Sequence, residues 1–399
     1  MNSDSYIRYG PYISYGHNAA TEMRISWRTN QYTLKKVLWY GSTEICEHEI
    51  LEEYSEPQTH HCVVLHDLTP NTKYYYRIKV GANDKDTNVF HFRTAPLIAE
   101  NPAEGFDFTV LGDIHANGLD RIQIDELFPA IRRNVKANQF YLAVGDSVDD
   151  GHREVDWDFF FENFNSWLSH TPLMNTTGNH DCSTPAKYAR FLSIWDHPYV
   201  NSKLGGFYSF QYGDVLFIMA DSDNGGTSGI SFSDEQMEWL EQELARGAKA
   251  NLWLFVCFHR QMYSTGDFSM EPLMHQYYRP LFDEYHVDCV LYGHDHNYQL
   301  FWTDRDSGWG GTKYFVCGAS GGPQRTELKI LGTNSGKTIH VWPNSTYSYE
   351  RDGLLPKGSE NDFNINTHLN DDVCKCQIYG VLVPNFVHFH ISGDNCMVR

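Results

Sequence analysis

The amino-acid sequence predicts two folded domains, an all-β sandwich followed by an α/β domain. The chain has 399 residues, whereas single hydrophobic cores usually stop growing at about 250–300 residues. Up to residue 94, short stretches of alternating apolar and polar residues are separated by turns, as in all-β proteins. From residue 106 onward, apolar strands alternate with amphipathic helical segments, which is the pattern of an α/β domain.

In the N-terminal domain, strands are expected where apolar and aromatic residues alternate with polar ones. These stretches are Met23–Trp27, Val37–Gly41, Cys62–Leu65 and Tyr74–Val80. An aromatic early strand, followed by a Leu-x-Pro turn and a Tyr-rich strand, resembles the fibronectin type III-like domain that precedes the catalytic domain of purple acid phosphatases. The resemblance implies a fibronectin III-like sandwich. We place this domain at 1–97 and a Pro- and Gly-containing linker at 98–105.

The second domain, 106–399, is expected to contain buried strands and amphipathic helices in alternation. Strands are predicted at 106–111, 140–144, 173–177, 252–258, 287–292 and 378–391. Helices are predicted at 119–135, at 157–168, and from a capping box at Ser233-Asp234-Glu235-Gln236 through Leu244. The stretch 324–372, rich in Asn, Gly and Ser, is expected to be an irregular surface excursion.

The composition is that of a folded protein with a large negative charge. Hydrophobic residues make up 41 % of the chain, and 31 basic residues against 51 acidic ones leave a formal charge of −20. A charge of this sign repels a polyanion and argues against dedicated nucleic-acid binding. No apolar stretch approaches the roughly 20 residues of a membrane span, and the N-terminus has no secretory signal pattern. We therefore expect no membrane association and favour a cytoplasmic location, with a secreted or periplasmic one open if a leader was trimmed.

Five of the predicted strands end in a short run of Gly, Asp, Asn or His. In α/β sheets, ligands bind outside the carboxyl ends of the strands, so we expect these side chains to meet in one cleft. The runs are Gly112-Asp113-Ile114-His115, Gly145–Gly151, Gly178-Asn179-His180-Asp181, the single His259, and Gly293-His294-Asp295-His296.

The residue types in these runs are those that bind metal ions. Carboxylates, imidazoles and a carboxamide oxygen, without cysteine, suit Zn, Mn or Fe. Seven candidate donors exceed what one ion usually takes from a protein, so two ions are expected. Two neighbouring cations polarise phosphoryl oxygens and generate hydroxide near neutral pH. The seven donors are Asp113, His115, Asp146, Asn179, His259, His294 and His296.

The order and spacing of these runs resemble the five blocks of the calcineurin-like metallophosphoesterase superfamily, GD-x-H, GD-x-x-D, GNH, H and GH-x-H. The resemblance implies an αββα four-layer domain and a phosphoric ester hydrolase that uses metal-bound hydroxide at a dinuclear site. Asp113, His115 and His296 would hold one ion, and Asn179, His259 and His294 the other, with Asp146 bridging them. His180 would protonate the leaving alkoxide or stabilise the transition state.

Two positions depart from the purple acid phosphatase branch of this superfamily. That branch has glycine where this chain has His115, and a metal-binding tyrosine where this chain has Asp149. Tyrosinate on ferric iron gives those enzymes their colour, so we expect this protein to be colourless. The run from His259 to Tyr263 is similar to that branch's His-x-Pro-x-Tyr block, with Gln261 in place of the usual proline.

Substrate contacts are expected from residues beside the donors. Arg260 and Tyr263 follow a candidate ligand, and His152 borders the second run, so each could reach a phosphate ester. The purple acid phosphatase-like architecture favours a phosphomonoesterase acting on small phosphate esters, whereas the GD-x-H block favours a phosphodiesterase, the cyclic-nucleotide type included. A third alternative is a non-catalytic interaction module, because some members of the superfamily have lost their ligands. The sequence leaves the physiological substrate, the metals and the oligomeric state open.

Overall fold

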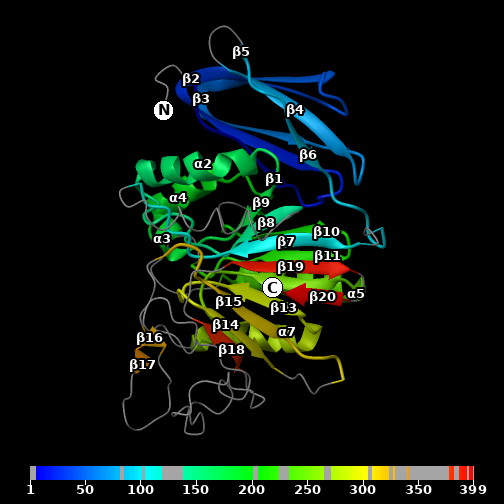
Figure 1. Ribbon diagram of the computed structural model, residues 1–399, viewed down its shortest axis with the longest axis vertical. Helices are drawn as coiled ribbons and strands as arrows, with labels where there is room; N and C mark the ends of the chain where they lie inside the picture. The colour runs from blue at the N-terminus through cyan, green and yellow to red at the C-terminus, as the bar shows by residue number, and fades with distance from the viewer. Residues whose placement is uncertain are drawn as a thin grey trace.

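Figure 1 shows the computed structural model of the chain, with the N-terminal strands at one end and two further sheets with their helices below. The structure describes residues 6–80, 85–100, 104–118, 138–200, 205–223, 233–264, 271–303, 308–322, 327–328, 339–340, 377–381, 386–392 and 395–398. The helix predicted at 119–135 lies outside the described residues, and so does most of the excursion predicted at 324–372. In the described part of the chain, no helix combines the length and apolar character needed to cross a membrane.

The N-terminal domain is a hydrogen-bonded sheet built around one long strand. β2 (Met23–Gly41) pairs antiparallel with β1 (Ile7–Tyr15), β3 (His48–Leu65) and β4 (Lys73–Val80). The short strands β5 (Lys85–Asp86) and β6 (Phe90–Arg93) both pair with β4. The separate strands predicted at 23–27 and 37–41 are the two ends of β2. Its exposed polar middle resembles a loop in sequence but stays extended because β3 pairs with it, with register shifts around Thr33.

The first sheet of the second domain has the strand order β20-β19-β7-β8-β9. β7 (Phe106–Leu111), β8 (Phe140–Ala143) and β9 (Leu173–Asn175) run parallel, so their carboxyl ends meet at one edge. β19 (Val387–Ser392) and β20 (Asn395–Val398) join the other side antiparallel. The three parallel strands lie within two residues of the bounds that the sequence predicts.

The second sheet has the order β10-β11-β12-β13-β15-β14-β18. Its parallel strands β11 (Val215–Met219), β12 (Trp253–Cys257), β13 (Cys289–Tyr292) and β15 (Lys313–Cys317) lie side by side. The antiparallel strands are β10 (Tyr208–Tyr212), β14 (Tyr298–Trp302) and β18 (Gln377–Val381). The single strand predicted at 378–391 is therefore wrong, because β18 and β19 belong to different sheets. The hairpin of β10 and β11 was not among the predicted strands.

Aromatic side chains join the two sheets of the second domain. The ring of Phe108 on β7 stacks with Phe389, at a centroid distance of 4.9 Å. It also meets Phe217 and Phe255 of the other sheet edge-on, at 5.2 and 5.8 Å. The two sheets therefore share one apolar core, and the carboxyl ends of their parallel strands come together.

Helices cover the outer sides of both sheets. α2 (Glu154–Leu168) shares a buried cluster with β7 and β8, whereas α5 (Asp234–Lys249), α6 (Pro272–Tyr277) and α7 (Arg279–Tyr285) pack on the second sheet. The N-cap predicted for α5 is confirmed, since the Ser233 hydroxyl accepts the main-chain N–H of Gln236 at 3.2 Å. Two shorter helices, α3 (Asn179–Cys182) and α4 (Pro185–Ile194), follow β9.

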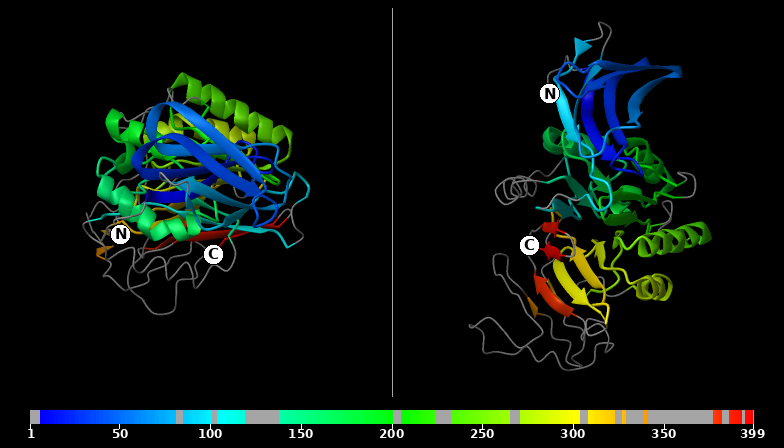
Figure 2. Two further views of the ribbon diagram at one scale, coloured as in Figure 1. Left: turned by 90° about the horizontal axis from the view of Figure 1, so that it is seen from above. Right: turned by 90° about the vertical axis from the view of Figure 1, so that its right-hand side faces the viewer.

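The two domains share buried surface. α2 contacts β1 on one side and the first sheet on the other, and the right-hand view of Figure 2 shows the blue N-terminal strands at the top, above the green helices. The ring of Tyr15 packs against Phe140 and Tyr212 at 6.0 and 5.9 Å. Arg8 donates two hydrogen bonds of 2.7 Å to the Asp158 carboxylate of α2. Apolar and paired polar contacts thus hold the N-terminal sheet against the second domain.

Candidate metal centre

The polar runs after β7, β8, β9, β12 and β13 meet at one place, although they come from two sheets rather than one. The main-chain N–H of His294 donates to Oδ2 of Asp113 at 2.9 Å, which joins the end of β13 to the end of β7. Nδ1 of His259, after β12, lies 2.9 Å from the carbonyl oxygen of Val144, after β8. The contact predicted between distant strand ends is therefore present.

The backbone after β7, β8 and β13 is strained. Asp113, His115, Asp146 and His294 have φ angles of 53°, 48°, 51° and 69°, in the left-handed region that side chains with a Cβ disfavour. Such angles persist only where the surrounding structure enforces them, and they gather at functional sites. The chain after β13 passes close to the Asp113 side chain, because a Cβ at Gly293 would lie 2.2 Å from Oδ2 of Asp113.

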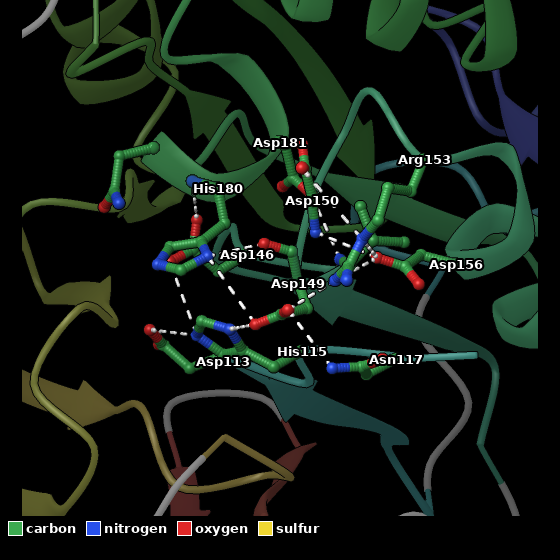
Figure 3. A network of polar contacts seen from close by, with 12 residues as sticks. Asp113, His115, Asn117, Asp146, Asp149, Asp150, Arg153, Asp156, His180 and Asp181 are labelled. Carbon is green, nitrogen blue, oxygen red and sulfur yellow. Dashed lines mark hydrogen bonds and ion pairs between the residues drawn. The ribbon is translucent and has the colours of Figure 1, made fainter. Parts of the chain in front are cut away.

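One group of candidate ligands consists of Asp113, His115 and His296, whose donor atoms lie within 4.8 Å of one another. Oδ1 of Asp113 is 3.3 Å from Nε2 of His296 and 3.9 Å from Nε2 of His115. All three side chains are buried. Figure 3 shows Asp113 and His115 turned toward each other on one side of this cluster.

A second group consists of Asp146, His259 and His294, again with donor atoms within 4.8 Å. Nε2 of His259 lies 3.2 Å from Oδ2 of Asp146 and 3.0 Å from Oδ1 of Asn179. Oδ2 of Asp146 is also 3.6 Å from Nε2 of His115, which belongs to the first group. Asp146 therefore lies between the two groups, and Asn179 joins the second.

His180 lies at the solvent side of the cluster. Its main-chain N–H donates to Oδ1 of Asp146 at 2.8 Å, and its Nδ1 lies 2.6 Å from the carbonyl oxygen of Asp149. The side chain is 40 % exposed, whereas that of His115 is 4 % exposed. With Nδ1 engaged by the carbonyl oxygen, Nε2 is the nitrogen of His180 available to a ligand.

The electrostatics of the cluster keep its carboxylates charged. Burial opposes ionisation of Asp113, but the imidazoles of His115 and His296, whose Nε2 atoms lie 3.9 and 3.3 Å from Oδ1, outweigh it and lower the Asp113 pKa below its ordinary value. Burial likewise opposes ionisation of Asp146, and the charge on His259 lowers its pKa well below the usual range. Burial alone would lower the pKa values of His115 and His259. The neighbouring carboxylates outweigh burial and raise the pKa of His115 to about 10 and that of His259 to about 9. The carboxylates of Asp113 and Asp146 are therefore charged, as carboxylates that bind a metal ion must be.

The donor set fits metal ions. Oδ1 of Asp113 and Nε2 of His115 are buried atoms without a hydrogen-bond partner in the described structure, although both face the first group. Leaving buried polar atoms unpaired costs free energy unless a ligand or ion satisfies them. Carboxylate oxygens, imidazole nitrogens and one carboxamide oxygen are suitable ligands for Zn, Mn or Fe.

Arg260 lies beside the second group and is held there by Ser222 and Asp223, which were not among the predicted site residues. Its Nη1 is 3.1 Å from Nε2 of His294, and its Nε and Nη2 donate to Oδ1 of Asp223 at 3.0 and 2.8 Å. The Ser222 hydroxyl accepts the main-chain N–H groups of His259 and Arg260 at 3.3 and 3.0 Å. Asp221-Ser222-Asp223 follows the buried strand β11, so it carries the same signal as the other runs.

The two other predicted substrate contacts lie in different surroundings. Tyr263 is fully buried, and its ring packs with Phe301 and Tyr314 in the apolar cluster under α6 and α7, so it offers no surface to a substrate. His152 is exposed, with Nε2 3.1 Å from the Thr184 hydroxyl. Its neighbour Gly151 donates its N–H to the carbonyl oxygen of His180, which places His152 near the rim of the cluster.

Comparison with known families agrees with this geometry. Residues 106–298 match the family described as calcineurin-like phosphoesterase, and residues 9–94 match the purple acid phosphatase N-terminal domain. Residues 106–298 therefore belong to the calcineurin-like phosphoesterase family, and residues 9–94 to the N-terminal domain type of the purple acid phosphatases. The family and fold imply a dimetal centre.

The chain is similar to proteins from bacteria and plants. It is 28 % identical over 334 residues to an uncharacterised protein of Mycobacterium tuberculosis. The match covers 73 % of this chain and 61 % of that protein. It is 31 % identical over 258 residues to purple acid phosphatase 21 of Arabidopsis thaliana, covering 62 % of this chain and 54 % of that protein. These matches span less than two thirds of either relative. Two other Arabidopsis relatives are named probable inactive purple acid phosphatases.

A solved structure shows the same fold. A purple acid phosphatase from yellow lupin seeds superposes with a TM-score of 0.72 at 17 % identity, covering 99 % of this chain and 72 % of that one. This likeness extends over both domains and establishes the architecture.

Proposed function

We propose that the protein is a phosphomonoesterase with a dinuclear metal centre. The position of Asp146 carries this proposal, because its Oδ2 lies 3.6 Å from His115 and 3.2 Å from His259, between the two groups of ligands. One carboxylate placed between two donor sets is what a shared pair of ions requires. The relatives named purple acid phosphatases, and one named phosphoenolpyruvate phosphatase, favour a small phosphate monoester as the substrate.

We assign the ligands according to these groups. Asp113, His115 and His296 would hold one ion and Asn179, His259 and His294 the other, with Asp146 shared. Bound there, Zn, Mn or Fe would polarise the phosphoryl oxygens and lower the pKa of water toward neutrality.

The remaining steps fall to side chains of the protein. Nδ1 of His180 is held by the carbonyl oxygen of Asp149, so a proton carried on Nε2 can pass to the leaving alkoxide oxygen. The guanidinium of Arg260 is fixed by Asp223 and directs Nη1 to the second group, where it can hold a phosphoryl oxygen. His180 would act on the negative charge that develops on the leaving oxygen, and Arg260 on the charge of the phosphoryl group. Electrostatic stabilisation is most effective where such charge is present in the transition state.

A phosphodiesterase is the second candidate function. His115 is the specific observation in its favour, since it completes the GD-x-H block and points Nε2 at the first group. The two activities differ in the charge that the site must accept, because a monoester dianion carries one more negative charge than a diester.

A panel of substrates separates these functions. The purified protein, supplied with Mn, Zn or Fe, is assayed with p-nitrophenyl phosphate, bis-p-nitrophenyl phosphate and a cyclic nucleotide. We expect the highest kcat/KM with the monoester. Faster hydrolysis of either diester favours the second candidate, and no hydrolysis with any metal contradicts both.

We also propose the finer features of the architecture. The shared core between the sheets and the helices on their outer sides support an αββα four-layer domain. The six-stranded N-terminal sheet supports a fibronectin III-like domain at 1–97, a linker at 98–105 and a second domain at 106–399.

A further inference from the structure

Asp149 contacts two histidines of the site through two different groups. Its carboxylate Oδ1 lies 3.4 Å from Nδ1 of His115, and its main-chain carbonyl oxygen lies 2.6 Å from Nδ1 of His180. The two imidazole rings meet edge to face at a centroid distance of 4.4 Å. Figure 3 shows Asp149 beside both rings, in a network that continues to Arg153.

We propose that Asp149 is a positioning residue: its carboxylate fixes His115 in the tautomer whose Nε2 lone pair faces the first group, and its carbonyl oxygen fixes the orientation of the His180 ring. A carboxylate and a carbonyl oxygen can only accept, so each Nδ1 must carry the hydrogen. With a hydrogen on Nδ1, the lone pair that His115 can offer to an ion is on Nε2, a buried atom that lies 3.6 Å from Asp146 and 3.9 Å from Asp113. This inference rests on the proposed function, because the Nε2 lone pair of His115 has a role only if the site binds a metal ion.

Other residues hold the carboxylate of Asp149 in place. Its Oδ2 accepts hydrogen bonds from Nδ2 of Asn117, at 3.2 Å, and from Nη2 of Arg153. Arg153 is itself fixed by the buried carboxylate of Asp156, to which its Nε donates at 2.8 Å. Oδ2 of Asp149 is therefore held in place by hydrogen bonds, and Oδ1 faces Nδ1 of His115.

The carbonyl group of Asp149 is fixed independently of its side chain. The main-chain N–H of Asp149 donates to the carbonyl oxygen of Ala116 at 3.1 Å, and Ala116 and Val148 form a parallel β-bridge. A change of the side chain should thus release His115 while leaving His180 held. The two roles can be separated by experiment.

The test compares metal binding with turnover. The full-length chain is titrated with Co²⁺, following both heat and the visible d–d spectrum of the ion. Since removing the partner of a metal-binding histidine typically weakens metal affinity by about 10–100-fold, we expect that loss in Asp149→Asn and Asp149→Ala. At saturating metal their kcat should approach that of the unchanged protein, whereas His180→Ala should bind Co²⁺ normally and lose kcat.

Control variants separate this role from a structural one. Asp150→Asn changes the next carboxylate of the same loop, which pairs with Lys187 at 2.9 Å, and should keep normal Co²⁺ affinity. Asp149→Glu keeps a carboxylate and should recover part of the affinity. Unchanged Co²⁺ affinity in both Asp149→Asn and Asp149→Ala overturns the inference but not the proposed function. Absence of Co²⁺ binding by the unchanged protein overturns both.

Discussion

The main-chain N–H of His294 donates a hydrogen bond of 2.9 Å to Oδ2 of Asp113, across 181 residues of sequence. Asp113 follows β7 of one sheet and His294 follows β13 of the other. This bond therefore joins the two sheets at the point where their ligands gather. It also uses one carboxylate oxygen of Asp113, which leaves Oδ1 directed at His296 and His115.

Replacing Asp146 by asparagine should lower hydrolysis of p-nitrophenyl phosphate by orders of magnitude. The amide keeps the shape but removes the negative charge that lies between the two groups of ligands. The measurement is kcat/KM at saturating metal. Asp107→Asn, on β7 but paired with His388 and His390, is the matched control and should retain activity. Activity near that of the unchanged protein in Asp146→Asn would remove Asp146 from the mechanism.

The iron-loaded protein should be colourless. Asp149 stands where purple relatives have tyrosine, and its carboxylate Oδ1 lies 3.4 Å from Nδ1 of His115. Without a phenolate ligand, ferric iron has no tyrosinate charge-transfer transition. The visible absorption spectrum of the protein loaded with Fe³⁺ tests this prediction. A strong band in the visible range would show that a tyrosine reaches the metal.

Arg260→Gln should raise KM for a phosphate monoester by about 10- to 100-fold, because a hydrogen bond to a charged group contributes about 1.5–3 kcal/mol. Asp223→Asn should act in the same direction, since Asp223 holds the guanidinium through two N–H groups. Inhibition by inorganic phosphate provides a second readout and should weaken in parallel. Arg246→Gln, on the exposed side of α5, is the control. Unchanged KM in both site variants would show that Arg260 does not contact the substrate.

Acid should destabilise the fold between about pH 6.5 and pH 3 through His197. Burial lowers the pKa of His197 to about 3, while in the unfolded chain it stays near 6.5. Below pH 6.5 the unfolded state therefore binds a proton that the folded state does not, so the free energy of unfolding falls as the pH falls.

Urea unfolding of the unchanged protein and of His197→Gln measures this contribution. Glutamine cannot take up the proton, so the variant should lose roughly 2 kcal/mol less than the unchanged protein between pH 7 and pH 5. The control is His17→Gln, because His17 is exposed. Equal losses in the protein and in His197→Gln would mean that His197 is protonated in the folded state.

The ligands could be predicted because each follows a short buried strand that local pattern reveals. Apolar runs that end in Gly-Asp or Gly-His located β7, β8 and β13, together with Asp113, Asp146 and His294. The resemblance implied two sheets, but the pattern does not state which strands pair, so which strand belongs to which sheet was not predicted. Pairing depends on contacts between segments far apart in the chain.

The residues that hold the site's side chains in place were harder to predict than the ligands themselves. Gly213-Asp214 between two aromatic runs is a hairpin signal that would have located β10 and β11, and with them Asp223. The bond from Arg260 to Asp223 joins residues 37 positions apart on different strand ends, and residue type alone does not specify it. Tyr263 shows the converse, since its place near a ligand in sequence gave no sign that its ring turns into the apolar cluster.

Elemental analysis of the purified chain tests the central claim most directly. If Asp113, Asp146, Asn179 and the four histidines form one shared site, the protein should carry about two ions of Fe, Mn or Zn per chain. Asp146→Asn should carry fewer under the same conditions. Less than one ion per chain in the unchanged protein, after exposure to all three metals, would contradict the account.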